Sequence, residues 1–92
     1  MSTKVIYKYE AGFPGGQHLI PPGYRVLCAQ EQDGKIQVWV EQDMFTTGTP
    51  RRVGFFIVPT GVSFDSDMTG DYVGTVLLEG GAYVFHIYAK EN

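Results

Sequence analysis

Short runs in which apolar and polar residues alternate recur along the whole chain. This alternation predicts strands, because successive side chains of a strand point to opposite faces. No window of about 10 to 12 residues sustains apolar spacing at i, i+3, i+4 and i+7, so little or no helix is expected. We expect about six to seven short strands, at residues 4–9, 17–20, 24–32, 35–41, 51–59, 72–79 and 82–89.

Glycine and proline separate these runs at positions typical of tight turns. Asp33-Gly34 lies between two alternating runs, which is the strongest short-range signal for a hairpin. Gly80-Gly81 predicts a second two-residue hairpin, and Pro21-Pro22-Gly23 predicts a stiff turn. The sequence therefore predicts an all-β fold, a small antiparallel sandwich or barrel.

The last three predicted strands carry apolar residues on both faces. In a sandwich that stands alone, one face of each strand should be polar. Either a loop covers the outer face of these strands, or a second subunit does. Since six Phe, six Tyr and one Trp also exceed what one small core is expected to hide, we expect a homo-oligomer.

Length and composition limit the class of protein. The 92 residues are expected to form one domain, 1–92. A net charge of −3 argues against a protein that binds the DNA or RNA backbone, which needs a surplus of Lys and Arg. The single Cys28 can form neither an internal disulfide nor a zinc site, and is interpreted as a buried thiol. With no apolar run of ~20 residues and no signal-peptide core, we expect a cytoplasmic protein without a membrane partner.

Three segments resemble a family of small uncharacterised proteins from tailed phages and prophages. They are residues 5–10 (VIYKYE), 20–40 (IPPGYRVLCAQEQDGKIQVWV) and, most specifically, 72–88 (YVGTVLLEGGAYVFHIY). The sequence departs from the family pattern at Pro59 and in the acidic stretch that follows. The resemblance implies a phage origin and hence the cytoplasm of a host cell. It implies no established activity, so it supplies no catalytic residues.

Residues suited to catalysis are few. His18 and His86 are the only imidazoles, and no serine sits in a sharp strand-to-helix turn. Cys28 and His86 both fall in predicted strands, but nothing in their spacing supports a nucleophile–base pair. We therefore expect no enzyme, no catalytic residue and no cofactor.

The acidic stretch Asp65–Asp71 resembles the start of a calcium-binding loop, with acidic residues at positions 1 and 3 and glycine at position 6. Position 12 is Val76, where such a loop needs a bidentate glutamate. A solvated loop with Asx turns is the better interpretation, and no metal site is expected.

A cluster of hydroxyls and guanidiniums is the best candidate for ligand binding. Thr47 and Thr49 precede Arg51-Arg52, and together they could hold a phosphate or carboxylate by charge-assisted hydrogen bonds. The alternative is that the two arginines point to opposite faces of a strand and pair with scattered carboxylates.

Two further residues have alternative interpretations. Trp39 lies among polar neighbours and could form a stacking platform with tyrosines, or fill a contact between subunits. His86 is either a ligand-binding residue or a strand histidine whose hydrogen bonds are satisfied.

The leading hypothesis is a non-enzymatic, oligomeric, phage-encoded binding protein. It would sequester an anionic host signalling nucleotide through Arg51, Arg52, Thr47, Thr49, Trp39 and His86, or block a host factor, as an anti-defence protein. The alternative is a minor structural component of the virion or of its assembly.

Overall fold

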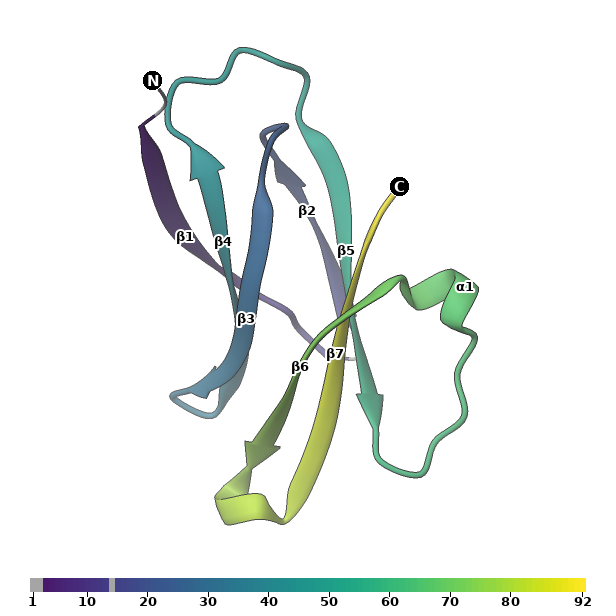
Figure 1. Cartoon of the computed structure of the whole chain (residues 1–92). Helices are drawn as coiled ribbons and strands as arrows, with labels where there is room; N and C mark the ends of the chain where they lie inside the picture. Colours follow the sequence, from purple (N-terminus) through teal and green to yellow (C-terminus); the bar gives the residue numbers. More distant parts are fainter. Residues whose placement is uncertain (1–2, 14) are drawn as a thin grey trace.

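Two antiparallel sheets face each other in a computed structural model that describes residues 3–13 and 15–92 (Figure 1). One sheet has the strand order β1-β4-β3 and the other the order β2-β5-β7-β6. Within the described residues the strands are β1 (Lys4–Glu10), β2 (Gly15–Ile20), β3 (Arg25–Gln32), β4 (Lys35–Asp43), β5 (Arg51–Pro59), β6 (Asp71–Leu78) and β7 (Tyr83–Glu91). The only helical elements there are the short α1 (Ser66–Thr69) and η1 (Glu79–Gly81). The predicted all-β sandwich is confirmed.

The core lies between the sheets and follows the alternation in the sequence. Val38 and Val40 of β4 point inward and are fully buried, as are Phe55 of β5 and Ile87 of β7. Burying each such side chain contributes about 1.5–3 kcal/mol relative to leaving it exposed. Trp39, between the two valines, points to the outer face of its sheet.

The β3–β4 turn confirms the prediction made from Asp33-Gly34. Asp33 has φ 55° and Gly34 has φ 79°, the pair of left-handed conformations that a type I′ turn requires. The β6–β7 connection is longer than the predicted two-residue turn, because Leu78 pairs with Tyr83 and residues 79–82 form the loop. The turn contains three residues with positive φ before Ala82, which are Glu79 at 52°, Gly80 at 67° and Gly81 at 96°.

Strands β3 and β6 approach each other, and each of them leads into a hairpin turn at the same end of the sandwich (Figure 1). Gly74 lies close enough to β3 that an added Cβ atom would come 3.7 Å from the carbonyl oxygen of Ala29. A β-bulge lies near this approach in each strand, between Val26 and Cys28 and between Tyr72 and Gly74. The β3–β4 and β6–β7 turns therefore lie at one end of the sandwich (Figure 1).

A loop with α1 covers part of the outer face of the four-stranded sheet. The Phe64 ring packs on Tyr88 with centroids 5.1 Å apart, and Lys90 Nζ donates to the Asp67 carbonyl. Asp65 Oδ1 accepts from the Asp67 amide at 2.9 Å and caps α1, which is the Asx turn expected here. The sequence predicted that either a loop or a second subunit covers the outer face of the last strands. The loop is present over part of that face, and the second subunit stays a prediction.

Candidate functional site

The predicted arginine cluster does not converge on one point. Arg51 and Arg52 are consecutive in β5 and pair with Ile20 and Leu19 of β2, so their side chains leave opposite faces of the sheet. Arg51 Nη1 lies 3.7 Å from Glu91 Oε2. The opposite faces and the Arg51–Glu91 pair match part of the alternative stated above, while a carboxylate partner of Arg52 stays a prediction.

The other sequence-predicted residues lie in the loop before β5 and in the two different sheets. Thr47 and Thr49 are exposed in the loop before β5. Trp39 is half-buried on the outer face of the three-stranded sheet, opposite Lys8 and Cys28. His86 lies on the outer face of the other sheet, so the structure does not bring His86 together with Trp39 or Cys28. A role for any of these residues in ligand binding stays a prediction.

His86 is held by a chain of hydrogen bonds. The Thr60 hydroxyl donates to the Val84 carbonyl at 3.2 Å, so the His86 Nε2–H donates to Thr60 Oγ1 at 2.9 Å. On the other side of the ring, Thr75 Oγ1 lies 3.0 Å from His86 Nδ1 and 2.6 Å from the Tyr72 hydroxyl oxygen. This chain of hydrogen bonds fastens the start of the covering loop to the sheet. No carboxylate belongs to it, so it lacks the orienting acid of a catalytic triad.

The second histidine is also occupied by structural contacts. The His18 ring packs between Tyr9 and Phe55, at centroid distances of 5.1 and 5.7 Å. Its Nε2–H donates to the Glu10 carbonyl at 2.8 Å. Both imidazoles therefore stabilise the fold.

A groove of about 640 Å³ runs between the starts of β3 and β6, with Tyr24 in its lining. The Tyr24 hydroxyl donates to Glu91 Oε1 at 2.8 Å, and the same carboxylate faces Arg51. Burial raises the pKa of Tyr24 to about 12, and the hydrogen bond to and the charge of Glu91 act in the same direction. The phenol therefore stays protonated at neutral pH.

This pKa predicts a loss of stability at high pH. The phenol of an unfolded chain loses its proton near pH 10, whereas the folded protein holds it to about pH 12. The unfolded state then binds fewer protons, so the free energy of unfolding falls between these pH values. Urea unfolding at a series of alkaline pH values is expected to show that the free energy of unfolding falls less steeply with pH in Tyr24→Phe than in the wild type. Equal slopes in the two proteins would contradict this assignment.

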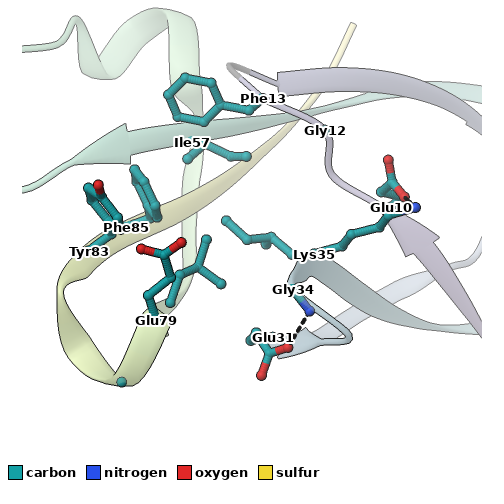
Figure 2. Close-up of a pocket in the computed structure, with 13 residues that line it drawn as sticks. Glu10, Gly12, Phe13, Glu31, Gly34, Lys35, Ile57, Glu79, Tyr83 and Phe85 are labelled. Atoms are coloured by element: carbon teal, nitrogen blue, oxygen red, sulfur yellow. Dashed lines mark hydrogen bonds and ion pairs between the residues drawn. The ribbon is translucent and has the colours of Figure 1, made fainter.

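A second concave feature lies at the end of the sandwich that carries the two hairpins (Figure 2). We call it the end cleft, and its volume is about 790 Å³. Its apolar floor is formed by Ile36 of β4, Ile57 of β5 and Leu78 of β6. Three turns of the backbone approach the cleft closely, because each has in the lining a glycine, which carries no side chain. These residues are Gly12, Gly34 and Gly80.

Three aromatic rings line one side of the end cleft. Tyr83 and Phe85 are two residues apart in β7, so they share a face, and their rings stack at 6.3 Å with an interplanar angle of 14°. Phe13, from the connection between β1 and β2, meets Phe85 edge-on at 5.6 Å. Phe13 and Tyr83 are 67% and 54% exposed, so both present ring surface to an occupant of the cleft.

Four charged residues complete the lining, and three of them are acidic. Glu10 is paired with Lys35 at 3.5 Å, and Glu31 accepts from the Gly34 amide at 2.6 Å. Within residues 3–13 and 15–92, the Glu79 carboxylate forms no hydrogen bond or ion pair. The end cleft thus combines apolar, aromatic and acidic groups.

Sequence reasoning missed the residues of this cleft. One signal was present, because Tyr83 and Phe85 are same-face aromatics directly after the Gly80-Gly81 turn. A second signal was Phe13, an apolar residue in the glycine-rich break between two predicted strands. Neither signal shows that the two segments meet.

The chain belongs to a protein family described as a domain of unknown function, DUF7352, whose model matches residues 2–92. No curated protein and no solved structure matches the chain significantly. The resemblance to an uncharacterised family is confirmed at this level, and the phage origin stays a prediction. In the part of the chain that the structure describes, no helix could cross a membrane and no group of three His, Cys, Asp or Glu could hold a metal ion.

Proposed function

We propose that this protein is a non-catalytic binding protein whose end cleft receives a ligand with an aromatic or aliphatic body. The observation that carries the proposal is the group of three rings, Phe13, Tyr83 and Phe85, beside a floor of apolar side chains. The volume of about 790 Å³ lies within the range of ~300–1,000 Å³ that ligand pockets occupy.

The aromatic side of the cleft is ordered before any ligand arrives. Phe85 contacts both Tyr83 and Phe13, so each exposed ring has a fixed neighbour. A ligand that covers the two exposed rings removes apolar surface from water, at about 25 cal/mol per Å². Little conformational entropy is then lost on binding, because the rings are already in place.

The narrower hypotheses from the sequence remain proposals. These are sequestration of an anionic nucleotide, blocking of a host factor in a phage-infected cell, and a structural role in the virion. Binding of a host factor is compatible with the end cleft. Three glutamates against one lysine disfavour an anion there, so a nucleotide would have to bind near Arg51 and Arg52.

Three small aromatic probes of similar size test the proposal: 2-phenylethylammonium, 2-phenylethanol and phenylacetate. Calorimetric or NMR titration of the wild-type protein is expected to show saturable binding of at least one probe. The double variant Phe13→Ala/Tyr83→Ala should weaken that binding about tenfold, which corresponds to a loss of ~1.4 kcal/mol.

The matched control is Phe45→Ala/Tyr7→Ala, which removes an exposed phenylalanine and an exposed tyrosine outside the end cleft. This variant should bind the probes as the wild type does. The proposal fails if no probe binds at millimolar concentration, or if the two double variants are affected equally.

A further inference from the structure

The charged groups of the end cleft differ in whether they already have partners. Glu10 is neutralised by Lys35, and Glu31 is engaged by the backbone amide of the β3–β4 turn. The Glu79 carboxylate has no partner within the described residues. Glu79 therefore leaves a negative charge in the cleft that a ligand can neutralise.

The position of Glu79 places this charge beside the aromatic rings. Glu79 begins the β6–β7 turn, and Tyr83 and Phe85 follow that turn on β7. Figure 2 shows the Glu79 carboxylate directed toward Tyr83 and Phe85, while the Lys35 side chain extends away from them toward Glu10. The carboxylate and the two rings thus border the same part of the cleft.

The backbone at Glu79 would suit glycine better than glutamate. Its φ of 52° is left-handed, and a residue with a Cβ atom pays about 1–2 kcal/mol there. Gly80 and Gly81, which follow, have positive φ without that strain. Backbone geometry alone therefore favours glycine at position 79, and it does not explain why glutamate occupies this position.

From these observations we infer that the ligand of the end cleft is an organic cation, an ammonium or guanidinium group attached to an apolar body. This inference rests on the proposed function of the cleft. Ring faces attract cations through their quadrupoles, and an unpaired carboxylate adds charge complementarity. The apolar body of the ligand lies on the floor formed by Ile36, Ile57 and Leu78, and its cationic group lies between Glu79 and the rings.

Such a cation has two chemical sources, a free amine or the Arg or Lys side chain of a peptide. The shared chemistry is the cationic head on an apolar stem. Spermidine and a blocked peptide, acetyl-Phe-Arg-amide, distinguish the sources when each is compared with 2-phenylethylammonium. Tighter binding of the peptide assigns the site to a protein partner, and tighter binding of either free amine assigns it to a small molecule.

The test compares the three aromatic probes with the wild type and with Glu79→Gln, which keeps the shape of the side chain and removes its charge. We expect 2-phenylethylammonium to bind more tightly than 2-phenylethanol, and phenylacetate to bind most weakly. Glu79→Gln should weaken binding of the cation about fivefold or more and leave binding of the alcohol unchanged. Asp33→Asn is the matched control, because it removes one negative charge from the neighbouring hairpin outside the cleft lining.

A second variant separates the role of the carboxylate from a structural role. Glu79→Gly relieves the left-handed strain, so its Tm should rise while its affinity for 2-phenylethylammonium falls. If the alcohol and the cation bind the wild type equally, or if Asp33→Asn weakens cation binding as much as Glu79→Gln, the inference is overturned and the proposed function stands. If none of the three probes binds, the proposed function itself fails.

Discussion

Phe55→Ala is expected to lower the free energy of unfolding by about 3–5 kcal/mol. Phe55 is 1% exposed and is the largest of the fully buried side chains between the two sheets. Its removal leaves a cavity that the surrounding strands can fill only in part. Since small proteins are stable by about 5–15 kcal/mol, urea unfolding followed by circular dichroism should show a large shift of the midpoint.

Phe45→Ala is the matched control for this change. Phe45 is 77% exposed in the loop between β4 and β5, so the same truncation should change stability by less than about 0.5 kcal/mol. A similar loss in both variants would show that Phe55 is not the centre of the core.

Gly70→Ala has the second largest expected effect. Gly70 ends α1 with φ 80° and ψ −135°, a conformation essentially restricted to glycine. An added Cβ atom would overlap the carbonyl oxygen of Ala89 and lie 2.7 Å from the Cβ atom of Lys90. Backbone strain and overlap together should cost about 2–4 kcal/mol, measured as a fall in the urea midpoint.

Gly61→Ala separates the two parts of that cost. Gly61 has φ 86°, but an added Cβ atom would meet nothing within 4 Å. Its replacement should therefore cost only the backbone strain, about 1 kcal/mol. If Gly61→Ala destabilises the protein as much as Gly70→Ala, the close packing of Gly70 on β7 is not what requires glycine there.

The sequence predicts the strands of this fold well because their signals are local. The alternation around Val38 and Val40 and the Asp33-Gly34 turn each specify structure within a few residues. The left-handed Glu79 was not predicted, since glutamate gives no sign of that conformation. The placement of the loop around Phe64 over Tyr88 depends on tertiary packing, which the alternation cannot show.

The candidate site was predicted less well for a physical reason. Arg51 and Arg52 attract attention because they are adjacent in sequence, yet adjacency in a strand sends side chains to opposite faces. The end cleft joins residues 10–13, 31–36 and 78–85, together with Ile57, and these segments meet only when the two sheets pack. Residues that are far apart in the chain therefore form the site, and their spacing carries no motif.

NMR titration of the ¹⁵N-labelled protein with 2-phenylethylammonium tests the central claim, that the end cleft binds an organic cation, most directly. Saturable shifts are expected at the amides of Gly12, Phe13, Gly80 and Tyr83, which lie around the cleft. In Glu79→Gln the probe concentration at half saturation should rise about fivefold or more. Shifts that gather instead around Thr47 and Arg52, or no saturable shift at millimolar probe, would contradict the account.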